Sequence, residues 1–242
     1  MKTFRELLGN PYIGYQGRER TEWSNTWIDK ASDDIDNRIL LIGDSTSRLI
    51  RSTMASVTGR PVDMIGSSFA IDDELFVNLI DSFFLNTIYK YNTIYIQIGT
   101  HSLYGKEGRI FGEKDYNDHY RNLNVLIDYL KQYTDNIVLE TCYLTVTKKI
   151  NVKSSIMKDI SEAGLMFLIR PFYKDYPHSL KNPIEKKKNE VIRKVASERS
   201  DIKFVDICSF MDKTKFVKYD AIHYEKAAKI VIVKELIGCL NN

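Results

Sequence analysis

Residues 38–48 read RILLIGDSTSR, an apolar run that ends in Gly43-Asp44-Ser45 and passes directly into a segment with helical spacing. Four large aliphatic residues in succession, bounded by turn residues, are typical of a strand that is buried on both faces. A strand, a tight turn and a helix in this order predict the first unit of an α/β fold.

The same alternation continues along the chain. Strands are predicted at 38–42, 61–65, 93–98, 136–141 and 202–207, and helical spacing is found at 48–58, 73–90, 115–133, 183–198 and 225–240. Asn182 before Pro183 suits an N-cap followed by proline at the first helical position. Strands that alternate with helices predict a parallel sheet covered on both faces. We therefore expect a flavodoxin-like three-layer α/β sandwich with a central five-stranded parallel sheet.

The chain of 242 residues is expected to form one domain, because α/β folds commonly reach this size without dividing. Residues 1–37 and 144–182 do not fit the alternation, so they are interpreted as an N-terminal extension and an insertion. The insertion interleaves lysines with aromatic residues, which suits either a cover over a substrate or a solvated cap on the sheet.

Composition excludes several classes of protein. The hydrophobic share of 43% supports a sizeable core, and 35 basic against 32 acidic residues are too balanced to indicate nucleic-acid binding.

The start lacks an apolar signal region and no run is long enough to span a bilayer, so we expect a cytoplasmic protein. Three scattered cysteines suggest no disulfide framework or zinc site. His119 and His178 are not paired at metal-binding spacing, so no metal is expected.

Ser45 stands where chemistry is expected in such a sheet. Ligands bind beyond the carboxyl ends of parallel strands, and a serine at a strand-to-helix junction lies beside the positive end of the helix. By itself the tripeptide is also compatible with an ordinary turn in which a hydroxyl caps the helix.

Asp220 and His223 precede the last amphipathic segment, in KYDAIHYEKAAKIVI. A hydroxyl becomes a good nucleophile when a neighbouring base takes its proton, and the base works best when a third group orients it. Asp-x-x-His can supply base and orienting acid from one loop. The alternative is a surface pair beside a helix start.

Together, Gly43-Asp44-Ser45 after the first strand and Asp220-x-x-His223 before the last helix resemble the SGNH, or GDSL-like, hydrolase superfamily, from Arg38 to the C-terminus. The resemblance implies Ser45 as nucleophile, His223 as base and Asp220 as orienting acid. It also implies an oxyanion hole built from the Ser45 amide, Gly66 and the residue at position 101.

Position 101 departs from the family pattern, because a histidine replaces the family's asparagine in Gly99-Thr100-His101. An imidazole can still donate one N–H to an oxyanion. The alternative is that His101 faces away and leaves two donors.

The resemblance implies a serine-dependent acyl-ester hydrolase, first of all an O-deacetylase acting on a carbohydrate or small ester. An O-acetyltransferase that moves acetyl groups to sugar hydroxyls in surface polysaccharide synthesis is the alternative, and a non-catalytic carbohydrate-binding module is a third. Hydrolysis needs no cofactor, whereas acetyl-CoA is a candidate donor for transfer. The sequence leaves the acyl group, the acceptor and the number of subunits open.

Overall fold

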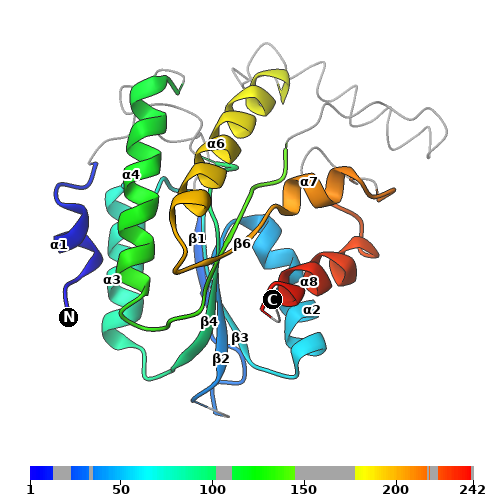
Figure 1. Cartoon of the computed structure of the whole chain (residues 1–242). Helices are drawn as coiled ribbons and strands as arrows, with labels where there is room; N and C mark the ends of the chain where they lie inside the picture. Colours follow the sequence, from blue (N-terminus) through cyan, green and yellow to red (C-terminus); the bar gives the residue numbers. More distant parts are fainter. Residues whose placement is uncertain are drawn as a thin grey trace, which may run out of the picture.

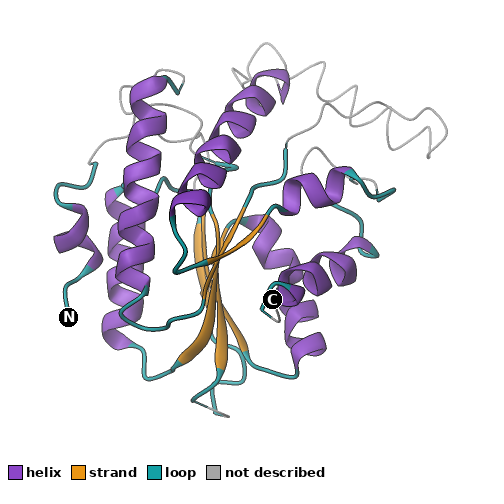
Figure 2. Cartoon of the chain, viewed as in Figure 1, coloured by secondary structure: helices purple, strands orange, loops and turns teal. Residues whose placement is uncertain are grey.

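A computed structural model describes residues 1–12, 23–32, 35–101, 111–144, 178–216, 218 and 223–240. Within these residues six strands form one sheet, and helices cover both of its faces (Figures 1 and 2). The strands are β1 (Ser24–Trp27), β2 (Arg38–Gly43), β3 (Val62–Ser67), β4 (Tyr91–Gln97), β5 (Ile137–Glu140) and β6 (Lys203–Val205). They lie in the order β1-β3-β2-β4-β5-β6 across the sheet.

The five predicted strands correspond to β2 through β6, and all of them pair in parallel. Numbered along the chain, these five have the order 2-1-3-4-5, which is the flavodoxin-like order. The predicted three-layer α/β sandwich is therefore confirmed. The order reverses between β2 and β4, and the residue that follows β2 lies at this switch point.

The prediction of a five-stranded, fully parallel sheet is wrong at one edge. β1 pairs antiparallel with β3, from Ser24 opposite Ser67 to Trp27 opposite Met64. The strand comes from the stretch interpreted as an extension. Its sequence, SNTW, is mostly exposed, so it lacks the apolar run or alternation by which a strand is found.

Two groups of helices sandwich the sheet. On one face lie α1 (Phe4–Leu8), α3 (Glu74–Asn86), α4 (Glu113–Leu130) and α6 (His178–Glu198). On the other lie α2 (Ser45–Thr58), α7 (Ile207–Asp212) and α8 (Ala228–Gly238). Leu40 and Ile42 of β2 pack into the first core, and Ile39 and Leu41 pack into the second. This double burial explains why β2 is an uninterrupted apolar run.

A buried ion pair ties three strands together at the edge where they begin. The Arg38 guanidinium, in β2, donates to both carboxylate oxygens of Asp63, in β3, at 2.9 and 2.6 Å. The hydroxyl of Tyr91, in β4, donates to the same carboxylate at 2.9 Å. Both charged side chains are fully buried. A buried charge is tolerated when it is paired and hydrogen-bonded in this way.

Most predicted boundaries differ from the structure by a few residues, and three of these differences have a clear local cause. α2 begins at Ser45 and not at residue 48, because the Asp44 side chain caps it by accepting from the Thr46 amide at 2.7 Å. β6 ends at Val205, since Asp206 caps α7 and the apolar Ile207 is buried in that helix. α6 starts at His178, so the prediction of Asn182 as N-cap and Pro183 as first helical residue is wrong; Pro183 lies inside the helix, where it removes one backbone hydrogen bond and crowds the carbonyl four residues earlier.

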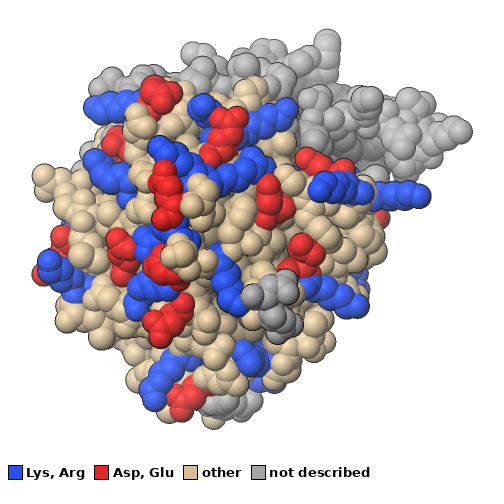
Figure 3. Space-filling view, viewed as in Figure 1, with Lys and Arg blue, Asp and Glu red and all other residues tan. Residues whose placement is uncertain are grey.

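The described surface mixes charges of both signs. On the face seen in Figure 3, basic and acidic side chains are interspersed. Among the described helices, none is long and apolar enough to cross a membrane.

Candidate active site

Ser45 is the first residue of α2 and directly follows the end of β2. Asp44 takes the capping position, so its carboxylate and the Thr46 amide fix the turn between strand and helix. The packing is tight, because a Cβ on Gly43 would lie 2.1 Å from the Ser47 hydroxyl oxygen. A glycine is therefore needed for this turn, and the serine is held at the positive end of the helix.

His223 is 178 residues away in the sequence, yet its Nε2 lies 2.7 Å from the Ser45 Oγ. The histidine precedes α8, and α8 packs against α2. The next residue, Tyr224, packs its ring edge-on against that of Tyr143, 5.3 Å between centroids. Packing on both sides thus presents the imidazole to the hydroxyl, at the distance that proton transfer from a serine requires.

Asp220, the predicted orienting acid, lies outside the described residues, so its part in the site stays a prediction.

Gly66 lies near the end of β3, in register with Gly43 of β2. A Cβ at this position would lie 3.0 Å from Cζ3 of the Trp23 indole and 2.9 Å from the Met64 methyl carbon. The structure thus supplies a reason for glycine that the sequence did not indicate, which is room for an aromatic ring. The proposed donation of its N–H to an oxyanion stays a prediction.

Trp23 is a site residue that sequence reasoning missed. Its backbone is fixed by hydrogen bonds to Ser68: the Trp23 amide donates to Oγ at 2.9 Å, and the Ser68 amide and hydroxyl donate to the Trp23 carbonyl at 3.0 and 3.3 Å. Its ring packs edge-on against His101, and the Arg48 guanidinium lies 5.6 Å from its centroid. Arg48 is three residues after Ser45 and so lies on the same side of α2. No local sequence pattern could indicate these contacts of Trp23, because they arise from the pairing of β1 with β3.

His101 is held through its backbone. Its carbonyl accepts a hydrogen bond of 2.6 Å from Nζ of Lys188, a lysine of α6 that is only 1% exposed. The ammonium also lies 4.4 Å from the centre of the Phe111 ring. This anchor fixes the loop after β4, while the His101 ring faces Trp23. Donation from the ring to an oxyanion remains a prediction.

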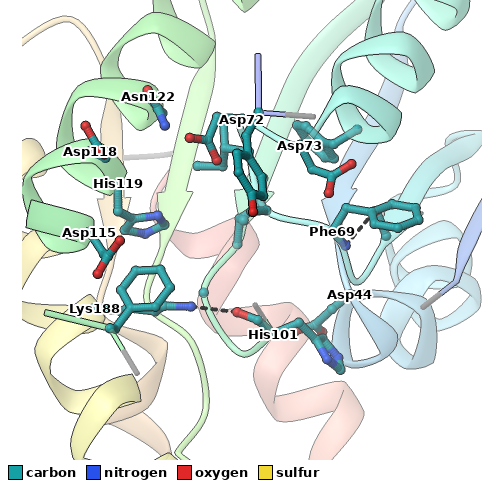
Figure 4. Close-up of a pocket in the computed structure, with 18 of the residues that line it drawn as sticks. Asp44, Phe69, Asp72, Asp73, His101, Asp115, Asp118, His119, Asn122 and Lys188 are labelled. Atoms are coloured by element: carbon teal, nitrogen blue, oxygen red, sulfur yellow. Dashed lines mark hydrogen bonds between the residues drawn. The ribbon is translucent and has the colours of Figure 1, made fainter. Parts of the chain in front are cut away.

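A cavity of about 60 Å³ adjoins this arrangement on the side of α3 and α4 (Figure 4). Gly43 and Asp44 form one end of its lining, and Gly99 and His101 also border it. Side chains of α4, α6 and the segment before α3 complete the wall. Asp44 directly precedes Ser45, so the cavity borders the turn that carries the serine.

A buried polar cluster lies behind the serine. The Thr46 hydroxyl contacts both Asp44 Oδ1, at 2.6 Å, and the Gln97 side chain. Glu140, at the end of β5, is 3% exposed, and its burial raises the pKa of the carboxyl to about 8, helped by the charge of Asp44. The carboxyl is therefore neutral at neutral pH. Within the described residues, no group of three or more histidine, cysteine or acidic side chains is arranged to hold a metal ion.

Comparisons with known proteins agree at the level of fold. No family model matches the sequence, and no curated protein matches it significantly. A solved structure from Streptococcus pneumoniae, provisionally named as a platelet activating factor, matches with a TM-score of 0.55 at 17% identity, over 84% of this chain and 83% of that one. The acetylxylan esterase Axe2 of Geobacillus stearothermophilus matches with a TM-score of 0.52 at 12% identity, over 85% and 94%. The chain thus has the fold of SGNH-type hydrolases, as the sequence motifs predicted.

Proposed function

We propose that this protein is a serine-dependent acyl-ester hydrolase, an O-deacetylase of a carbohydrate or small ester, which works through an acyl-serine intermediate. The observation that carries the proposal is the 2.7 Å contact between Ser45 Oγ and His223 Nε2 at the switch point of the sheet. A non-catalytic module with this fold would not need these two side chains to meet.

In the proposed reaction the Ser45 Oγ attacks the ester carbonyl carbon while His223 Nε2 takes its proton. The oxyanion that forms accepts hydrogen bonds from the backbone N–H of Ser45 and from Gly66, with His101 as a third donor. The imidazolium then gives its proton to the leaving alkoxide, and an acyl-serine remains. Asp220 orients the imidazole and stabilises its charged form. Water attacks the acyl-serine with His223 again as base, the Ser45 Oγ leaves and takes the proton back from the imidazolium, and the carboxylic acid is released, so no cofactor is consumed.

The alternative function uses the same groups for a different second step. If a sugar hydroxyl replaces water, the protein is an O-acetyltransferase, and acetyl-CoA is a candidate donor. A transferase must keep water away from the acyl-serine while the acceptor is bound. The two functions therefore differ in what clears the intermediate.

Intact mass after brief mixing with p-nitrophenyl acetate tests the proposal. We expect an acetyl adduct in the wild type that is absent from Ser45→Ala and that clears in water with release of acetate. An adduct that persists in water and clears only with an added sugar would identify the transferase. Neither adduct nor p-nitrophenol release, in a protein shown to be folded, would contradict both.

We expect His223→Ala to slow acylation by roughly 10²–10⁴-fold, the usual contribution of a general base. The adduct itself should still form, slowly, on Ser45. An unchanged rate would show that His223 is not the base.

A further inference from the structure

The cavity beside Ser45 has a lining whose charge and polarity indicate what it binds. Its volume of about 60 Å³ is several times the roughly 10–15 Å³ that one water molecule needs, so it accommodates a few polar groups along one edge of a ligand. It begins at Asp44, one residue before the proposed nucleophile. A ligand held in the cavity would therefore lie against the turn that carries Ser45, with a neighbouring ester group able to extend to the serine.

His119 is the polar side chain that most directly calls for a ligand. It is 9% exposed, and its Nε2 is buried with no hydrogen-bond partner among the described residues. In Figure 4 the ring projects from α4 toward the middle of the cavity. Burial, together with the nearby Lys188, lowers the pKa of His119 to about 3, so the ring is neutral. A buried polar atom without a partner is costly, and a bound group that can both donate and accept would satisfy it.

The charged groups of the lining decide the sign of that ligand. Among the residues that the structure describes, five aspartates and one lysine border the cavity, and one of these aspartates, Asp118, is also paired with Arg121. Asp115 and Asp118 flank His119 on α4, and Asp72 and Asp73 face them from the segment before α3 (Figure 4). The lysine is Lys188, whose ammonium already donates to the His101 carbonyl and lies over Phe111. An anionic ligand would meet mainly like charges, which is unfavourable in a partly enclosed site.

Much of the apolar lining is aromatic. Tyr12, Phe69, Phe76 and Phe111 contribute to the wall between these polar groups. Aromatic faces suit the C–H faces of a sugar ring, while carboxylates accept hydrogen bonds from its hydroxyls. A hydroxyl can also donate to or accept from a neutral imidazole.

We propose that this cavity, with His119 at its centre and Asp115 and Asp118 of α4 in its wall, is a subsite for one edge of an uncharged sugar ring and discriminates against acidic sugars. The inference rests on the proposed function in one respect: the ester group attached to the bound sugar is taken to be the group that Ser45 attacks.

The test compares two substrates that differ at one carbon, the O-acetyl esters of methyl glucoside and of methyl glucuronoside. We expect kcat/KM for acetate release to be at least tenfold higher for the neutral ester. In Asp118→Asn this ratio should fall several-fold, because one of the repelling charges is gone. Asp128→Asn is the matched control, since Asp128 is also an aspartate of α4 paired with an arginine but does not line the cavity. Its ratio should equal that of the wild type.

His119→Leu should raise KM for the glucoside ester, and His119→Gln, which keeps hydrogen-bonding groups, should restore part of the loss. Equal rates on the two esters, a preference for the uronate, or an Asp118→Asn ratio identical to that of the wild type would overturn the proposal.

Binding to Ser45→Ala separates this inference from the proposed chemistry. Titration of that variant with unacetylated methyl glucoside and methyl glucuronoside, followed by NMR, reports on the cavity without turnover. We expect tighter binding of the glucoside. If acylation of Ser45 fails but this preference is found, only the proposed catalysis is wrong; if acylation succeeds and the preference is absent, only the subsite is wrong.

Discussion

Lys188 of α6 donates a 2.6 Å hydrogen bond to the backbone carbonyl of His101, in the loop after β4. The lysine is almost fully buried, so contacts with this carbonyl and with the face of the Phe111 ring replace the hydration of its ammonium group. The loop that it holds borders both Trp23 and the cavity. A side chain far from Ser45 in the sequence thus sets the geometry of the site.

Lys188→Met should loosen this loop while keeping most of the side-chain volume. We expect the free energy of unfolding to fall by about 1.5–3 kcal/mol, the usual worth of a hydrogen bond to a charged group. Misplacement of the loop should lower kcat on p-nitrophenyl acetate by about 10–100-fold. Urea unfolding and steady-state kinetics measure the two effects. Lys187→Met is the control, because this neighbouring lysine is exposed; a similar loss there would argue against the anchor.

Gly66→Ala should be destabilising by about 1–3 kcal/mol, because the new methyl group meets the Trp23 indole at 3.0 Å. Trp23→Leu in the same chain should recover a large part of that loss, so the double-mutant cycle reports a coupling between the two positions. Gly238→Ala meets no atom within 4 Å and should change stability by less than about 0.5 kcal/mol. Additive effects of Gly66→Ala and Trp23→Leu would disprove the contact.

Glu140→Gln should change how stability depends on pH. Burial raises the pKa of this carboxyl from 4.5 to about 8 in the folded chain. Between these values the unfolded chain loses a proton that the folded chain keeps, so the wild type loses stability as the pH rises from about 4.5 to 8. Glutamine has no proton to lose and avoids this penalty.

The variant should therefore be more stable than the wild type by roughly 2–4 kcal/mol at pH 8, and by under about 1 kcal/mol at pH 5. Urea denaturation at the two pH values gives the comparison. The exposed Glu190→Gln serves as the reference and should show no such trend. An equal difference at both pH values would mean that Glu140 is already ionised in the folded protein.

Asp63→Asn should lower the free energy of unfolding by about 3–5 kcal/mol, because it leaves the buried Arg38 guanidinium without its counter-charge. Thermal unfolding measures the loss. Asp36→Asn removes an exposed partner of Lys90 and should cost under about 1 kcal/mol. Similar losses in the two variants would show that burial of the Arg38 pair carries no special weight.

Much of the fold could be predicted because its signals are local. The apolar run in β2, the turn at Gly43-Asp44-Ser45 and the helical spacing that follows are properties of neighbouring residues, and their repetition along the chain indicated a parallel three-layer sandwich. The ends of strands and helices were harder to predict where a residue type is common in both kinds of element. Ile207 is apolar in either a strand or a helix, and only its burial against the second core places it in α7.

The candidate site was only partly predictable. Ser45 and His223 could be singled out by residue type and chain order, but their 2.7 Å contact depends on the packing of α8 against α2. Trp23 and His119 carried no signal, since an aromatic residue before an exposed strand and a histidine within a helix have many ordinary roles. Their neighbours come from β3, α2 and α6, which are distant in the sequence.

By itself, therefore, the sequence determined the order of strands and helices and the chemistry available at the end of β2, because hydrophobic periodicity and turn residues act over a few positions. The tertiary structure alone decided the sixth strand, the aromatic neighbour of Gly66 and the acidic lining of the cavity. These depend on side chains that come from separate elements and are buried together, and burial is set by the packing of the whole chain.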